Sequence, residues 1–175
     1  MIRLIVVILF LVITLCKSST SDNGHLSVVS KSDSVLTTQN DTVNYDYATY
    51  FIVIADTSLN YYTLQKKMFE LNKQYHLTID TMGRYYNKEK DLIALPDNDE
   101  DEMYAGSYFP RRDASKYLSI EYLNFYSDKL PEKTIALITG IYENETSADS
   151  ALIMLKSFQK NAFKLKTTIY VGCMH

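Results

Sequence analysis

A pattern of strand, helix and strand occurs twice in this chain, and it limits the folds that the chain can adopt more than any other feature. In the first half, the β-branched and aromatic run at 49–56 is typical of a buried strand. A helix capped by Ser58 or Asn60 should follow, because apolar residues recur there at spacings of three and four. These residues are Tyr61, Leu64, Met68, Leu71 and Tyr75. The alternating stretch at 77–81 predicts a second strand.

The second half repeats this order of elements. The apolar run at 133–142 predicts a strand, and Thr146 or Ser147 is expected to cap the helix that follows. One side of that helix is apolar and holds Ala148, Ala151, Leu152, Leu155 and Phe158. Alternation of apolar residues from 163 to 171 then predicts a closing strand.

Two half-repeats of this kind predict an α+β, ferredoxin-like fold. Their strands interleave into one antiparallel sheet, and both helices cover the same face. An inserted loop and hairpin lie between the halves, with a turn at 87–90 and a returning strand at 91–95 that Pro96 ends. The stretch 116–126 fits both a strand and a helix, and we favour a strand. The second sheet face is expected to be open and lined with tyrosine, since the chain has 15 Tyr, 7 Phe and no Trp.

The first residues have the pattern of a secretory signal. Arg3 precedes an apolar stretch at 4–15, which is too short to span a bilayer comfortably, and small polar residues follow. We expect a signal peptide at 1–18, a flexible linker at 19–46 and one domain at 47–175. A lipoprotein signal that ends at 15 and leaves a lipid on Cys16 is the alternative, although Leu15 departs from the small residue usual there. Either leader directs the domain to the periplasm or cell envelope.

Charge and cysteine content exclude several classes of protein. The net charge is −3 and no Lys/Arg-rich run occurs, so nucleic acid is not an expected partner. Only two cysteines are present, and Cys173 has no partner once Cys16 is cleaved off or lipidated, so no disulfide framework is expected. Cys173 and His175 are too few ligands for a metal site. No phosphate-binding loop or dinucleotide fingerprint occurs, and no cofactor is expected.

An acidic run from Asp97 to Glu102 is the most unusual local feature. Its spacing is not that of an EF-hand, because Glu102 and Tyr108 occupy the positions that need Gly and Glu. We expect Arg111 and Arg112 to pair with these acids. A looser cation site and a pair of glycosidase carboxylates are two other hypotheses, although adjacent acids in a loop do not establish the separation that glycoside hydrolysis requires.

The second half resembles the SPOR repeat domain of bacterial cell-envelope proteins. Gly140 and Tyr142 match the Gly-small-aromatic step that ends the first strand of such a repeat, and Ala148 and Leu152 match its helix. The first half departs from it, with Ala55 and Asp56 where the Gly would stand, and the acidic insertion is foreign to the family pattern. The resemblance implies a non-catalytic module that lies on peptidoglycan through its open sheet face.

Mixtures of Arg and Tyr suggest where a glycan would bind. Tyrosine stacks on the C–H faces of sugars, and arginine donates hydrogen bonds to their hydroxyl groups. The predicted ligand-binding residues are Arg84, Tyr85, Tyr86, Tyr104, Tyr108, Arg112 and Tyr142. The expected function is non-enzymatic binding of peptidoglycan or another surface glycan. An envelope protein–protein adaptor is the alternative, and a carboxylate-dependent glycoside hydrolase comes after both.

Overall fold

The computed structural model describes residues 46–172. The elements are β1 (Tyr47–Ser58), α1 (Tyr61–Tyr75), β2 (Tyr85–Asn87), β3 (Leu92–Ala94), β4 (Ser119–Tyr122), the 3-10 helix η1 (Leu123–Phe125), β5 (Ile135–Tyr142), α2 (Glu145–Lys156) and β6 (Phe163–Tyr170). The predicted signal peptide, all but the last residue of the predicted linker, and Cys173 to His175 lie outside the described residues.

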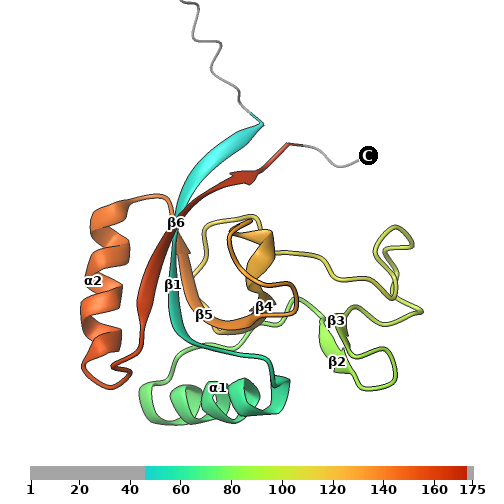
Figure 1. Ribbon diagram of the computed structural model, residues 1–175, viewed down its shortest axis with the longest axis horizontal. Coiled ribbons are helices and arrows are strands. Elements are labelled where there is room, and N and C mark those ends of the chain that lie inside the picture. The colour runs from blue at the N-terminus through green and yellow to red at the C-terminus, as the bar shows by residue number, and fades with distance from the viewer. Residues whose placement is uncertain (1–45, 173–175) are drawn as a thin grey trace, which may run out of the picture. The chain divides into compact units, whose positions relative to one another are not determined.

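Four strands form one antiparallel sheet in the order β4-β5-β1-β6, and β2 pairs with β3 in a separate hairpin (Figure 1). The first half consists of β1, α1 and β4, and the second consists of β5, α2 and β6. The halves interleave, because β1 lies between β5 and β6. The predicted α+β, ferredoxin-like fold is therefore confirmed.

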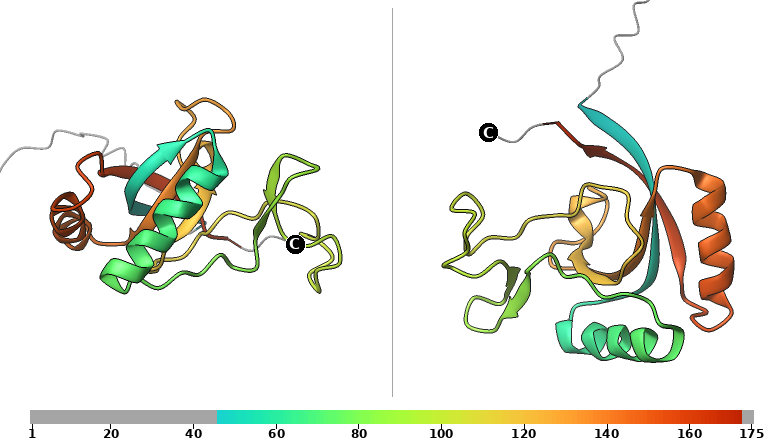
Figure 2. Two further views of the ribbon diagram at one scale, coloured as in Figure 1. Left: turned by 90° about the horizontal axis from the view of Figure 1, so that it is seen from below. Right: turned by 180° about the vertical axis from the view of Figure 1, so that it is seen from behind.

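Both helices pack on the same face of this sheet (Figures 1 and 2). Leu64 and Met68 of α1 join Ala148 and Leu155 of α2 in one buried apolar cluster with Val53 of β1. The spacing of apolar residues predicted both helix faces because each turn returns a side chain to the sheet.

Each helix begins at an asparagine that accepts a hydrogen bond from the backbone N–H three residues later. Asn60 caps α1, as predicted, through a 3.2 Å bond from Thr63. Asn144 caps α2 through a 3.2 Å bond from Ser147, so the prediction of Thr146 or Ser147 as the cap is wrong. The Asn144 side chain accepts a hydrogen bond from the first turn, so the helix begins directly after it, at Glu145.

The insertion lies within the first half, between α1 and β4, and it extends away from α2 (Figure 1). The predicted strand at 77–81 is wrong, because only Ile79 pairs there, in a single bridge to Leu118. Met82 and Gly83 both have positive φ angles, 54° and 75°, and they turn the chain before a ladder can extend. The second strand of the first half is β4 instead, so the stretch 116–126 contains both the strand and a helical turn.

The sheet face opposite the helices is closed, and the prediction of an open tyrosine-lined face is wrong. Ile52, Ile54 and Ile138 on this face are 0% exposed. The chain between β4 and β5, which we call the covering segment (123–134), folds back over the face and buries Leu123 and Tyr126 against it. Between residues 46 and 172 no helix is long and apolar enough to cross a membrane.

Candidate ligand pocket beside a buried arginine cluster

Glu121 is a charged residue at the margin of the closed face, on the edge strand β4. It is 0% exposed and lies on β4, where residues alternate between the two sheet faces. Ile120 packs into the helix-side cluster, so its neighbours Ser119 and Glu121 point to the covered side. A buried carboxylate is stable only if charges and hydrogen-bond donors surround it.

Two arginines supply the opposite charge. Nη2 of Arg84 and Nε of Arg111 each lie 3.3 Å from Oε1 of Glu121, and both arginine side chains are buried. The backbone N–H of Arg111 donates to Oε2 at 3.3 Å. We call Arg84, Arg111 and Glu121 the arginine cluster.

Hydroxyl groups complete the surroundings of the carboxylate. Ser119 and Tyr126 donate to its two oxygens, and the Tyr108 hydroxyl lies 3.4 Å from Oε2. The same Tyr108 oxygen accepts from the backbone N–H of Tyr122 at 3.2 Å. Glu121 is therefore saturated by donors from β4, the covering segment and the insertion.

Arg84 also joins two separate parts of the insertion. Its Nε donates to the carbonyl of Thr81 at 3.0 Å, and its Nη1 donates to the carbonyl of Phe109 at 2.6 Å. Because the same guanidinium contacts Glu121, the insertion is anchored to the sheet through one buried side chain. This arrangement holds the segment around Phe109 beside the covering segment.

The protonation states in the cluster follow from these contacts. Burial by itself would raise the pKa of Glu121, but the guanidinium groups of Arg84 and Arg111 outweigh it and hold that pKa below its ordinary value. Burial, and then the Glu121 charge, raise the pKa of Tyr108 and of Tyr126 well above the usual range. Glu121 is therefore ionised and both phenols are neutral. Two positive charges face one negative charge, so the cluster keeps a net positive charge.

A cavity of about 340 Å³ opens beside this cluster, between the insertion, the covering segment and β6. Its lining residues are Tyr104, Tyr108, Pro110, Arg111, Arg112, Phe125, Tyr126, Thr168, Ile169 and Tyr170. We call it the aromatic pocket. The Tyr104 ring packs on Phe109 with centroids 4.6 Å apart, and Phe125 packs on Tyr108 at 4.8 Å. No Asp or Glu is among the lining residues.

Arg112 lies at the edge of this pocket. Its guanidinium carbon is 5.3 Å from the centroid of the Phe109 ring, and its Nη1 donates to the carbonyl of Gly172 at 3.4 Å. Within the described part of the chain, Nε of Arg112 and Nη2 of Arg111 are buried atoms without a hydrogen-bond partner. The pocket therefore combines aromatic walls with unused cationic donors.

The structure brings together three of the predicted ligand-binding residues, namely Tyr104, Tyr108 and Arg112, in the aromatic pocket. Arg84 is 4% exposed and is held behind the pocket by Glu121, so its side chain is not at the surface. The contact with Glu121 identifies Arg84 as a structural residue. The sequence does not indicate this contact, because the two residues are 37 positions apart.

The other predicted residues lie elsewhere. Tyr85 is 43% exposed on β2 and is not among the residues that line the aromatic pocket. Tyr86 stacks on Tyr61 of α1 at 4.9 Å, and its hydroxyl donates to Asp91 at 2.6 Å. These contacts place both tyrosines at the hairpin, with Tyr86 helping to fix it against α1.

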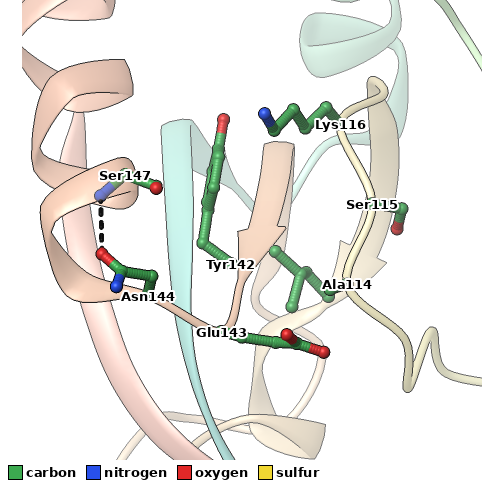
Figure 3. A pocket seen from close by; sticks show the side chains of 8 residues that line it. Ala114, Ser115, Lys116, Tyr142, Glu143, Asn144 and Ser147 are labelled. Atoms are coloured by element: carbon green, nitrogen blue, oxygen red, sulfur yellow. Dashed lines mark hydrogen bonds between the residues drawn. The ribbon is translucent and has the colours of Figure 1, made fainter.

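Tyr142 lines a different cavity, of about 240 Å³, near the start of α2 (Figure 3). The Lys116 ammonium lies 5.7 Å from the centroid of the Tyr142 ring, and the Lys116 side chain points toward that ring. Asn144 in this cavity is already bonded to Ser147 as the helix cap. Tyr142 also packs against the helix-side apolar cluster, so it does not contribute to the aromatic pocket.

The acidic run forms a locally bonded loop. Asp97 pairs with Lys90, Asp99 accepts the backbone N–H of Asp101 at 3.0 Å, and Asp101 accepts that of Met103 at 3.1 Å. The predicted pairing with Arg111 and Arg112 is wrong, because Arg111 pairs with Glu121 and Arg112 donates to the carbonyl of Gly172. Across residues 46–172 no group of three or more His, Cys, Asp or Glu side chains is placed to hold a metal ion.

Sequence reasoning missed Phe125 and Glu121. Phe125 is 52% exposed although it is large and apolar, and it precedes the buried Tyr126 in a short helical turn. Glu121 alternates with apolar neighbours, a pattern that also fits a charge facing solvent. The sequence shows a charged residue in a short strand next to several tyrosines, but it does not show which residues pair with that charge.

Comparison of the chain with protein-family models, with curated proteins and with solved structures gives no match.

Proposed function

We propose that this protein is a non-catalytic binding domain that holds part of a surface glycan in the aromatic pocket. The observation that supports this function is the pocket itself, with a volume of about 340 Å³ and walls made by Tyr104, Tyr108, Phe125 and Tyr170. Small-molecule sites have volumes of this order, mostly apolar walls and a few polar groups that fix orientation. A sugar ring offers C–H faces to the aromatic walls and hydroxyl groups to the arginine at the edge.

The ionised, fully hydrogen-bonded state of Glu121 supports the proposal that the protein has no enzymatic role. A glycosidase needs one carboxyl group that keeps its proton and a second carboxylate across the scissile bond. Glu121 is ionised and saturated by Arg84, Arg111 and hydroxyl groups, and no acid lines the pocket. In the acidic run, Asp97 pairs with Lys90, and Asp99 and Asp101 accept backbone N–H groups of their own loop.

Peptidoglycan is the proposed glycan, in the periplasm or cell envelope of a bacterium. The leader pattern at 1–18 and the resemblance of 136–158 to a SPOR repeat both support this location. The proposed docking place differs from the sheet face that the resemblance implies. Here the covering segment closes that face, and the pocket at its margin offers the aromatic surface instead.

Co-sedimentation with purified insoluble peptidoglycan tests this function. The wild-type domain is expected to pellet with the wall, and Phe125→Ala should weaken the apparent affinity roughly fivefold to tenfold, since an aromatic contact contributes about 1 kcal/mol or more. Tyr85→Ala is the matched control, because it removes a similarly exposed ring that lies on the hairpin. Absence of pelleting, or equal loss in both variants, would contradict the proposal.

A protein–protein adaptor is the second candidate, and one observation favours it. Ile153 and Met154 of α2 are 73% and 56% exposed, although they are apolar and adjacent. Exposed apolar neighbours are typical of contact surfaces. If the adaptor role is correct, crosslinking in envelope fractions should yield a specific partner that Ile153→Ser removes, while Phe125→Ala leaves the crosslink intact.

A further inference from the structure

We propose that the group bound in the aromatic pocket carries a carboxylate, so that the ligand is an acidic saccharide. This inference rests on the proposed function and names the chemical class of its ligand. Its grounds are the charge of the arginine cluster, the unused donors of Arg111 and Arg112, and the lack of acids among the residues that line the pocket.

The charge of the arginine cluster is not balanced by the described residues. Arg111 is 0% exposed, and it shares its acidic partner Glu121 with Arg84. Arginine stays protonated in proteins, so one positive charge remains beneath the pocket wall. A buried charge without a counter-charge is costly, and an anion in the pocket would relieve that cost.

The hydrogen-bond donors point to the same conclusion. Nη1 of Arg111 is close to the Ser115 hydroxyl at 3.4 Å and to the carbonyl of Tyr117 at 3.3 Å. Nη2 of Arg111 and Nε of Arg112 have no such partner among residues 46–172, although both are buried atoms. Both arginines line the aromatic pocket. Hydrogen bonds from arginine to an anionic oxygen are among the stronger ones in proteins.

Nothing negative in the lining competes with a bound anion. None of the lining residues is acidic. The nearest buried acid, Glu121, is already saturated by its own donors, and Asp97 in the acidic run pairs with Lys90. The positive charges of Arg111 and Arg112 in the lining therefore favour anionic ligands.

A carboxylate fits these donors better than a phosphate does. The unused donor atoms are Nη2 of Arg111 and Nε of Arg112, and one planar carboxylate offers one oxygen to each of them. A phosphate group brings more acceptor oxygens, and several of them would stay unbonded against the walls of Tyr104 and Phe125. The aromatic walls then receive the apolar face of the ring that bears the carboxylate.

Isothermal titration with a matched pair of sugars tests the inference. The probes are tetragalacturonic acid and the same tetramer with its carboxyl groups reduced to alcohols. The acid is expected to bind roughly tenfold tighter or more at low salt, and the difference should shrink as ionic strength rises. Equal affinity for both tetramers, or binding of neither by protein that still pellets with peptidoglycan, overturns the carboxylate. Loss of pelleting as well overturns the proposed function instead.

Two variants locate the effect. Arg112→Met should remove most of the preference for the acid, because it weakens binding of the acid more than binding of the reduced tetramer. Lys160→Met is the matched control, because it removes one positive charge from an exposed residue outside the pocket lining, and it should keep the preference. If Arg112→Met keeps the full preference, the inference is wrong. Arg111→Lys, checked for folding by circular dichroism, should weaken the preference because one point charge cannot replace the guanidinium fork.

Inorganic phosphate distinguishes the two anion chemistries. At matched ionic strength, acetate should displace tetragalacturonic acid at least as well as phosphate does. Stronger displacement by phosphate would overturn the assignment of a carboxylate.

Discussion

The two faces of the sheet are closed by different means. Two amphipathic helices cover one face with apolar side chains such as Leu64 and Leu155. A 3-10 turn and coil cover the other, and the margin of that side holds the arginine cluster around Glu121. The helix side is stabilised by removal of apolar surface from water. On the coil side, buried ions fix which segments meet, because an ion pair in the interior adds little net stability but is costly to break.

The largest expected effect is on the coil side. Glu121→Gln leaves Arg84 and Arg111 without a counter-charge, and the free energy of unfolding should fall by roughly 3–5 kcal/mol. Urea titration followed by circular dichroism measures this loss. Glu132→Gln is the control, because Glu132 is exposed and its replacement should change stability by less than about 0.5 kcal/mol. A loss below about 1 kcal/mol for Glu121→Gln would mean that water reaches the cluster.

On the helix side the expected loss comes from a cavity. Leu64 is 0% exposed, and Leu64→Ala should lower the free energy of unfolding by about 3 kcal/mol in the same titration. Leu59→Ala, at a position that is 79% exposed, should cost little. Similar losses for the two leucines would show that α1 does not pack on the sheet as described.

The two sheet faces should differ more in how their stability depends on pH than in how it depends on urea. The pKa of Glu121 lies below its ordinary value of 4.5 in the folded protein, so the unfolded chain binds the proton more tightly. The stability that this group contributes is complete above about pH 4.5 and is lost as the pH falls toward the folded pKa.

Below that pH the free energy of unfolding of the wild type should therefore fall more steeply than that of Glu121→Gln, by at most about 1.4 kcal/mol per pH unit for one proton. Leu64→Ala should keep the wild-type slope, because it changes no titrating group. Parallel curves for the wild type and Glu121→Gln, measured by urea titration between pH 3 and pH 6 (about the range in which carboxylates titrate), would contradict the ionised state of Glu121.

Sequence patterns predicted the helix side because its residues repeat with the period of a helix. Tyr61, Leu64, Met68 and Leu71 are all buried as expected. The covering segment has no such period, so its position over Ile52 and Ile138 could not be inferred. The prediction of a strand at 77–81 was wrong for a related reason: alternation gives the local preference, whereas the turn at Met82 and Gly83 decides whether pairing continues.

The candidate site was only partly predictable. Tyr104, Tyr108 and Arg112 were selected because Tyr and Arg occur together in the insertion, and these three do line one pocket. Arg84 belongs to the same segment of sequence, but its partner Glu121 is 37 positions away. A pairing across such a distance depends on the fold and leaves no local pattern, so a surface arginine and a buried one look alike in the sequence.

The smallest expected effect concerns how the coil is held on the sheet. The Thr167 hydroxyl of β6 donates to the carbonyl of Tyr126 at 2.7 Å, directly beyond the end of η1. Thr167→Val keeps the shape of the side chain and removes this bond, which should cost about 1 kcal/mol in the urea titration. Thr168→Val is the matched control, since Thr168 is exposed and points to the other side of the strand, away from Tyr126.

Hydrogen exchange adds a local measurement to this comparison. With the Thr167 bond absent, the amide of Tyr126, which donates to the carbonyl of Leu123, should exchange faster, while amides in α1 and α2 keep their protection. Faster exchange confined to the covering segment would show that the coil side opens independently of the helix side. Equal acceleration in both helices would mean instead that the two faces open as one cooperative unit, and that the coil is as firmly built into the fold as the helices are.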